Sequence, residues 1–146
     1  YDHSLLDHQR LTLDSYDENI YRELISRSRT FGFKEDVDAL LEKGLIKGGS
    51  LNNAVLLDEK GIVNEEKLRY PDEFVRHKIL DFIGDMFLLG KKVEGHFEIF
   101  CGGHSLTQEL LKTLMSDNSN WKLMDEITSD FDKRSIESRA EISAAI

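Results

Sequence analysis

The chain has 146 residues, of which 40% are hydrophobic and 32% are charged, a composition typical of one globular domain with its own core. Its 28 acidic residues outnumber its 19 basic ones, and the resulting net charge of −9 argues against broad nucleic-acid binding and against docking to an anionic membrane. No apolar run approaches the roughly 20 residues that a membrane-spanning helix needs.

The start of the chain and its single cysteine give expectations about processing and location. The sequence begins at Tyr1 rather than at Met, and it lacks the basic start and long apolar run of a signal peptide, so we expect a fragment or a processed chain. Cys101 has no second cysteine with which to form an internal disulfide bond. We therefore expect a location in the reducing cytoplasm.

Short strands and helices are predicted for the first third of the chain. Polar and apolar residues alternate over 10–15, which predicts a strand, and Asp17 is a suitable N-cap for the helix that follows. Residues 29–33 are rich in β-formers and predict a second strand, and 35–43 predict a helix that Gly44 ends in a left-handed conformation. The apolar residues expected to face inward from the two helices are Ile20, Tyr21, Leu24, Ile25, Val37, Leu40 and Leu41.

The middle of the chain contains a turn, a hairpin and the longest helix. The two glycines in 47–50 would let the backbone pass close to a bulky group, although a flexible turn is the simpler interpretation of these four residues alone. Residues 53–57 and 61–64 predict a hairpin. Pro71 interrupts the chain, because the residue before a proline disfavours helix, and a long helix is predicted over 74–89.

A strand, a helix and a tail are predicted for the C-terminal part. The strand covers 92–100 and the helix 106–114, after which the pattern fades into a polar, partly ordered tail over 116–146. Trp121 and Leu123 are expected to contact the core. Strands and helices mix without regular βαβ alternation, so we expect an α+β fold, a two-layer sandwich of a mixed sheet with two main helices. The apolar residues expected to face inward here are Val93, Phe97, Ile99, Leu106, Leu110, Leu111 and Leu114.

The helix over 74–89 has two different faces. Successive residues turn by about 100°, so His77, Asp81 and Asp85 follow one another at i, i+4 and i+8 on one side. An imidazole and a carboxylate one turn apart can bind one metal ion, although such a pair is more often an exposed hydrogen bond. A zinc site needs at least three protein ligands, so a site here requires a ligand from elsewhere. The apolar residues on the opposite arc are Val75, Ile79, Phe82, Ile83 and Met86.

Four separated segments form a recognisable set. They are 29–33 (Arg-Thr-Phe-Gly-Phe), 47–50 (Lys-Gly-Gly-Ser), 72–90, which begins Asp-Glu-Phe-Val-Arg-His-Lys-x-x-Asp-x-x-Gly-Asp, and 102–104 (Gly-Gly-His). Their order and spacing resemble the second half of the zinc-dependent UDP-3-O-acyl-N-acetylglucosamine deacetylases of lipid A (lipopolysaccharide) biosynthesis. The resemblance extends from about residue 1 to residue 114.

This resemblance implies an amide hydrolase built of two similar α+β lobes that face each other across the active site. The chain is similar to the C-terminal lobe only, over 1–115, with an inserted β-α-β element over about 29–57. The first lobe of such enzymes carries a His-Thr-Val-Glu-His-type motif, which gives the third zinc ligand and a general-base Glu and has no counterpart in this sequence. The resemblance thus implies Zn²⁺ as cofactor, the first lobe as partner, and an isolated chain without activity.

Matching positions imply roles for five residues. His77 and Asp81 match the zinc ligands that the second lobe provides. His104 matches the catalytic histidine of the Gly-His motif, which stabilises negative charge and protonates the leaving amine, and Asp85 would hold its imidazolium. Thr30 matches a threonine whose hydroxyl can bond the oxyanion of the tetrahedral intermediate.

The resemblance also implies a site for the UDP-linked acylated glucosamine. Lys78 is expected to meet phosphate or sugar oxygens, Phe31 and Phe33 to flank the sugar, and Tyr1 to stack on uracil. Cys101 stands where some family members carry a basic residue, so a phosphate contact from that position is absent. The residues expected along an apolar passage for the acyl chain, of which two or three should face a cavity, are Val37, Ile46, Gly49, Ser50, Leu51, Ala54 and Leu56.

Two other functions stay open at this point. The isolated lobe could bind an acyl chain or a nucleotide without turnover, or the His77–Asp81 pair could belong to a metal-dependent phosphohydrolase. Phosphohydrolases of that class usually supply further His and Asp ligands from several helices, which this sequence does not show. We expect no nucleic-acid partner and no membrane span, and the sequence leaves the preferred acyl length undetermined.

Overall fold

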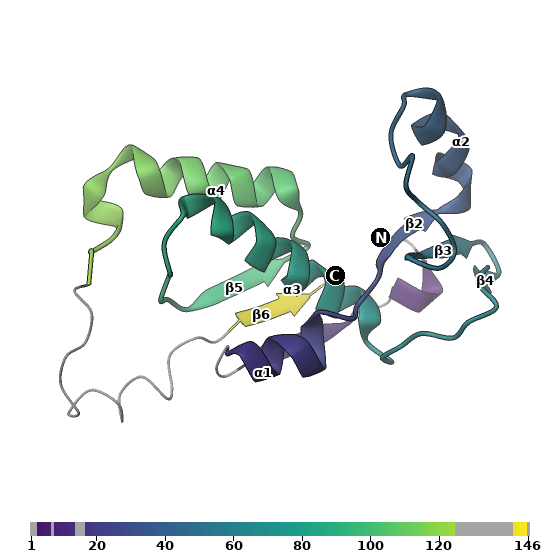
Figure 1. The fold of residues 1–146 in the computed structure, drawn as a ribbon, viewed down its shortest axis with the longest axis horizontal. Helices are drawn as coiled ribbons and strands as arrows, with labels where there is room; N and C mark the ends of the chain where they lie inside the picture. Colours follow the sequence, from purple (N-terminus) through teal and green to yellow (C-terminus); the bar gives the residue numbers. More distant parts are fainter. Residues whose placement is uncertain (1–2, 7, 14–16, 125–141, 146) are drawn as a thin grey trace.

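The computed structural model describes residues 3–6, 8–13, 17–124 and 142–145. Over these residues the chain forms two three-stranded sheets with helices packed against them, which confirms the predicted α+β class (Figure 1). No helix in these ranges is long and apolar enough to cross a membrane.

One sheet combines strands that are far apart in the sequence. Its order is β1 (Arg10–Leu13), β6 (Ile142–Ala145) and β5 (Phe97–Phe100), with β6 antiparallel to β1 and parallel to β5. The helices α3 (Glu73–Met86) and α4 (His104–Ser116) contact each other and lie over this sheet (Figure 1). This is the expected sandwich of a mixed sheet with two main helices.

The second sheet contains the predicted insert. Strand β2 (Thr30–Phe33), helix α2 (Lys34–Glu42) and strand β3 (Ala54–Asp58) form a β-α-β element in which the two strands pair in parallel. Strand β4 (Gly61–Ile62) returns antiparallel to β3 as the expected hairpin. Gly44 has a φ of +71°, which is the predicted left-handed conformation after α2.

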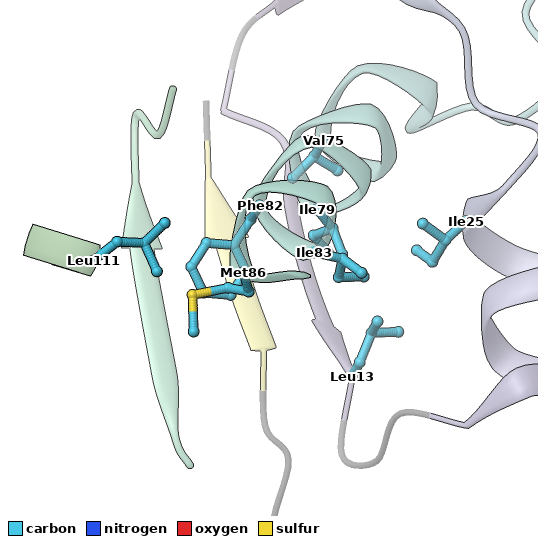
Figure 2. Packing of buried hydrophobic residues seen from close by; sticks show 8 residues of the cluster. All are labelled: Leu13, Ile25, Val75, Ile79, Phe82, Ile83, Met86 and Leu111. Atoms are coloured by element: carbon cyan, nitrogen blue, oxygen red, sulfur yellow. The ribbon is translucent and has the colours of Figure 1, made fainter. Parts of the chain in front are cut away.

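The apolar arc of α3 lies at the centre of the main core. All five residues predicted for this arc are buried, and they pack with Leu13 of β1, with Ile25 and with Leu111 of α4 (Figure 2). Complete burial of one such side chain contributes about 1.5–3 kcal/mol, so the arc determines how α3 is rotated on the sheet. The polar residues at i, i+4 and i+8 consequently face away from this core.

A smaller core attaches the insert to the start of α3. Phe74 of α3 packs with Leu6, Val55 and Leu57, all of them buried. Phe31 of β2 meets the Phe74 ring edge-on, with 5.0 Å between the ring centroids. The β2–β3 sheet is therefore fixed against the first turn of α3.

The first predicted helix is only partly regular. Asp17 caps α1 (Glu18–Ile20) by accepting hydrogen bonds from two backbone N–H groups, as expected. The chain then continues as a π-helical segment, Tyr21–Ile25. A π-helix has more residues per turn than an α-helix, so the 3.6-residue pattern misplaces its faces. Ile25 is buried as predicted, but the prediction that Leu24 faces inward is wrong, because Leu24 is exposed.

Three further predictions of regular structure or burial are corrected. The strand predicted over 92–100 is limited to β5, and Val93 is exposed. The α-helix predicted to residue 89 ends at Met86 and is followed by one short 3₁₀ turn. Leu41 and Leu106 are exposed rather than inward, because α2 and α4 each contact the body of the protein along one narrow stripe only.

The region predicted as a tail differs most from expectation. Trp121 and Leu123 are both exposed, so their predicted core contacts are wrong. At the other end of this region, β6 forms the middle strand of a sheet, which the sequence did not predict. Strands β1 and β5 offer hydrogen-bond partners on both sides, so pairing rather than local pattern determines this strand.

Candidate active site

His77 and Asp81 lie side by side one turn apart on α3. Nε2 of His77 is 3.2 Å from Oδ1 of Asp81, and the two side chains are only 14% and 16% exposed. Nδ1 of His77 lies 3.2 Å from the backbone carbonyl oxygen of Ser28, in the connection before β2. A carbonyl oxygen only accepts, so Nδ1 carries a proton, and Nε2 is the ring nitrogen that faces Asp81.

When Nε2 of His77 carries no proton, this arrangement brings two acceptors face to face. The Nε2 lone pair and the Asp81 carboxylate repel each other unless a cation lies between them, either a second imidazole proton or a metal ion. Two ligand atoms each about 2.1 Å from a tetrahedral zinc ion would be roughly 3.4 Å apart. The observed 3.2 Å is close to that separation, so the donor pair fits zinc.

Asp81 keeps its negative charge across the physiological pH range. Burial raises the pKa of the Asp81 carboxyl group, but hydrogen bonds and charges from His77 and Lys78 outweigh burial and lower the pKa to about 2. Nζ of Lys78 lies 2.9 Å from Oδ2 of Asp81. The lysine thus holds one carboxylate oxygen, while the other faces the imidazole.

A second histidine–carboxylate pair lies beside the first. Nδ1 of His104 is 3.0 and 2.9 Å from the two carboxylate oxygens of Asp85. His104 is the first residue of α4 and is 62% exposed, while Asp85 is largely buried on α3. Nε2 of His104 lies 4.0 Å from Oδ1 of Asp81, so α3 and α4 together assemble all four side chains at one place.

Among the described residues, two side chains at this place have the chemistry of metal ligands, rather than three. Within that part of the chain, no group of three or more His, Cys, Asp and Glu side chains is arranged to hold a metal ion. Because a zinc site in a protein needs at least three protein ligands, the pair on α3 would hold zinc only together with a further ligand from outside the described residues.

The other residues that the resemblance assigned to the site lie at different distances from the two histidine–carboxylate pairs. Lys78 lies over the ring of Phe31, with Nζ 5.7 Å from the centroid. Thr30 is exposed at the first position of β2, two residues after the Ser28 carbonyl that contacts His77. The backbone at Thr30 is therefore near α3, and its role toward an oxyanion stays a prediction. Tyr1 lies outside the described residues.

The predicted acyl passage lies on the insert, and its side chains differ in exposure. Val37, Ala54 and Leu56 are half-buried, whereas Ile46 and Leu51 are exposed. The predicted passage residues Gly49 and Ser50 lie in the exposed turn after α2. A cavity of about 470 Å³ opens nearby, but none of these seven residues lines it. Its lining residues are His3, Phe33, Lys34, Glu35, Leu57, Asp58 and Glu59.

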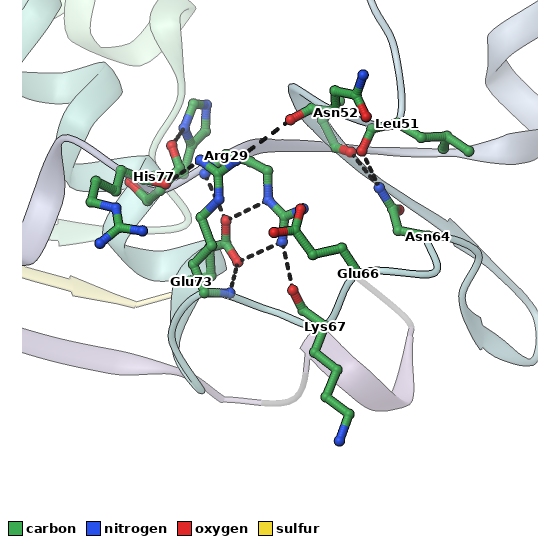
Figure 3. Close-up of polar contacts among 12 residues, drawn as sticks. Arg29, Leu51, Asn52, Asn64, Glu66, Lys67, Glu73 and His77 are labelled. Atoms are coloured by element: carbon green, nitrogen blue, oxygen red, sulfur yellow. Dashed lines mark hydrogen bonds and ion pairs between the residues drawn. The ribbon is translucent and has the colours of Figure 1, made fainter.

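Three residues that sequence reasoning missed lie directly behind the site. Glu73 is 0% exposed and forms a buried ion pair with Arg29 (Figure 3). Ser28 supplies the carbonyl that contacts His77. The sequence did contain a signal for the position of Glu73. This residue precedes His77 by four positions, so the two side chains lie on the same face of the helix.

The sequence of this chain is similar to that of a known family and of several named proteins. The profile of the UDP-3-O-acyl N-acetylglycosamine deacetylase (LpxC) family matches residues 1–116. Three similar proteins carry the name UDP-3-O-acyl-N-acetylglucosamine deacetylase. The Lawsonia intracellularis protein is 47% identical over 119 residues, the Syntrophus aciditrophicus protein 50% over 121, and the Sulfurimonas denitrificans protein 45% over 134.

The matches cover most of this chain but less than half of each relative. They include 82%, 83% and 90% of the chain, and 38%, 38% and 45% of the Lawsonia, Syntrophus and Sulfurimonas proteins, respectively. The chain therefore spans about two fifths of the length of these relatives. The pair on α3 provides only two potential metal ligands, which agrees with a site whose remaining ligand comes from the part of such proteins that this chain does not cover.

Proposed function

Because this chain belongs to the UDP-3-O-acyl-N-acetylglucosamine deacetylase family, we propose that it is the second lobe of a zinc-dependent amide hydrolase. The complete enzyme removes acetate from UDP-3-O-acyl-N-acetylglucosamine in lipid A biosynthesis. The observation that carries this proposal is the meeting of two histidine–carboxylate pairs, with Nε2 of His104 only 4.0 Å from the Asp81 carboxylate. One pair suits a metal ion, and the other suits proton transfer.

In this proposal His77 and Asp81 hold the zinc ion. His77 binds through Nε2 and Asp81 through Oδ1, while Lys78 neutralises the other carboxylate oxygen. When bound, zinc polarises the amide carbonyl and makes its water acidic enough to attack near neutral pH. The first lobe supplies the third ligand and the general base.

His104 moves the proton that the reaction requires at its leaving group. Asp85 accepts a hydrogen bond from the Nδ1–H group of His104, and Nε2 carries the second proton of the imidazolium. When the amide C–N bond breaks, Nε2 gives this proton to the departing amine, and acetate leaves with the oxygen of water. The Thr30 hydroxyl donates to the oxyanion of the tetrahedral intermediate.

The substrate lies across α3 and the insert. Lys78 meets phosphate or sugar oxygens, Phe31 and Phe33 flank the sugar, and Tyr1 stacks on uracil. The acyl chain follows the apolar residues of the insert named above, of which Ile46 and Leu51 are exposed and available for contact. We place the enzyme in the cytoplasm, where a reducing environment suits the single cysteine.

Metal content and acetate release test this proposal together. The chain combined with a first lobe should bind one zinc ion and release acetate from the UDP-linked substrate. The chain alone should bind zinc weakly and release none, since two ligands leave half of a tetrahedral coordination sphere to water. Tight stoichiometric zinc in the chain alone would contradict the two-ligand site. Substrate binding without acetate release by the combined lobes would favour a binding role instead.

A further inference from the structure

The carboxylate of Glu73 is a buried anchor for one particular peptide group. Its Oε1 accepts hydrogen bonds from the backbone N–H and the Nε of Arg29, both at 2.9 Å. Its Oε2 accepts from Nη2 of Arg29 at 3.1 Å and from the backbone N–H of Arg69 at 2.6 Å. Glu73 and Arg29 are 0% and 3% exposed, so water does not compete for these bonds.

Further bonds hold the Arg29 side chain at its outer end. Nη1 lies 3.1 Å from the Glu66 carboxylate, and Nη2 lies 3.0 Å from the backbone carbonyl of Lys67. The planar guanidinium is thus bound on several sides by groups from one loop and from the first turn of α3 (Figure 3). Such a side chain leaves the backbone of residue 29 little freedom.

The peptide group between Ser28 and Arg29 connects this anchor to His77. In a planar trans peptide, the N–H and the C=O point in opposite directions. Here the N–H points to Glu73, and the C=O points to Nδ1 of His77 at 3.2 Å. Glu73 and His77 are one turn apart on the same face of α3, so a single peptide bridges two successive turns of the helix.

This bridge sets the orientation of the His77 ring, which matters for binding a metal ion. The Ser28 carbonyl requires a proton on Nδ1 and fixes how the ring is turned. The charged Glu73 polarises the peptide through its N–H and so strengthens the carbonyl as an acceptor. Thr30 follows directly after the anchored residue, so its position depends on the same contacts.

We infer that Arg29 and Glu73 are positioning residues that hold the Ser28–Arg29 peptide against Nδ1 of His77 and so direct Nε2 toward Asp81 and the metal position. The part of this inference that concerns zinc rests on the proposed function. The part that concerns the orientation of His77 and the proton on its Nδ1 does not depend on it.

The test compares two double variants of the complete enzyme. Arg29→Met/Glu73→Leu removes the anchor but leaves no unpaired buried charge, and such replacements of buried ion pairs are often tolerated. Asp72→Leu/Arg76→Met is the matched control, since it removes an ion pair of 2.6 Å between the N-cap residue and the first turn of α3, and neither side chain bonds this peptide. Thermal unfolding checks that both variants are folded.

Two measurements decide the outcome. Zinc competition with a chelator should give affinity about 10–100-fold weaker for Arg29→Met/Glu73→Leu and nearly unchanged for the control. In metal-free protein, ¹⁵N spectra of labelled histidine should show a proton on Nδ1 of His77 in the unmodified enzyme and in the control, and an Nδ1 that is only partly protonated in Arg29→Met/Glu73→Leu. An unchanged Nδ1 signal and unchanged zinc affinity in that variant would overturn the inference.

The unmodified enzyme provides a further check if the Arg29→Met/Glu73→Leu variant does not fold. Metal-free unmodified enzyme must show a proton on Nδ1 of His77, and an Nδ1 without a proton would refute the inference. If that enzyme has a proton on Nδ1 but binds no zinc, the proposed function fails while the positioning by Arg29 and Glu73 stands.

Discussion

Asp85 and His104 form a hydrogen-bonded pair in which both carboxylate oxygens lie within 3.0 Å of one imidazole nitrogen. Asp85 is on α3 and largely buried, whereas His104 is exposed at the first position of α4. A buried carboxylate therefore fixes the orientation of a histidine at the surface. The remaining nitrogen of that histidine faces the His77–Asp81 pair.

Replacing Asp85 by Asn in the complete enzyme should lower turnover about 10²-fold, because a neutral amide cannot offset the charge of the His104 imidazolium. Bound zinc should stay the same, since Asp85 is not a proposed ligand. Acetate release and metal analysis on one preparation measure both quantities. Loss of zinc from Asp85→Asn would show that Asp85 belongs to the metal site.

His104→Ala and His77→Ala should both lower activity, but only one of them should lose the metal ion. His104→Ala should lower turnover by about 10²–10⁴-fold and keep zinc, because it removes a general acid alone. His77→Ala should lose the metal ion and, with it, all activity. Zinc content, measured beside the rate of acetate release, separates the two. Equal zinc loss in both variants would contradict the separate roles assigned to these histidines.

The buried Glu73 should make stability depend on pH. Burial raises the pKa of Glu73, but hydrogen bonds from Arg29 and from the Arg69 backbone outweigh burial and lower it below its ordinary value of 4.5. The stabilisation is therefore complete above that ordinary value, and it is lost as the pH falls through the lowered pKa of the folded state. The Arg29 pKa is raised, so Arg29 stays charged throughout this range.

Urea unfolding at several pH values measures this effect. The free energy of unfolding of the unmodified protein should fall, relative to Arg29→Met/Glu73→Leu, as the pH decreases from about 5 to about 3. The difference should be constant between about pH 6 and pH 8. Asp81 is present in both proteins, so its own titration cancels in the comparison. A difference that does not change on acidification would contradict the lowered pKa of Glu73.

Ile79→Ala should lower the free energy of unfolding by about 2–5 kcal/mol, because Ile79 is completely buried in the α3 core and its truncation leaves a cavity. Leu106→Ala is the matched control on α4, where the side chain is exposed, and its effect should be within about 0.5 kcal/mol. Chemical denaturation measures both. Equal losses in the two variants would mean that the described packing of α3 is wrong.

The sequence by itself determined those features that depend on nearby residues. The buried arc of α3 and the alignment of His77 with Asp81 follow from helical spacing, which needs no knowledge of the rest of the chain. The Asp17 cap and the left-handed Gly44 are equally local. The family resemblance, carried by short motifs, added the assignment of His104.

Only the tertiary structure decided contacts between distant segments. Arg29 and Glu73 are 44 residues apart, and either would be expected at the surface when considered alone. Strand β6 forms by pairing with β1 on one side and β5 on the other. Ser28 contacts His77 because β2 begins beside α3. Helix faces are set by the 3.6-residue turn, whereas these partners are set by how whole elements pack, which no local pattern encodes.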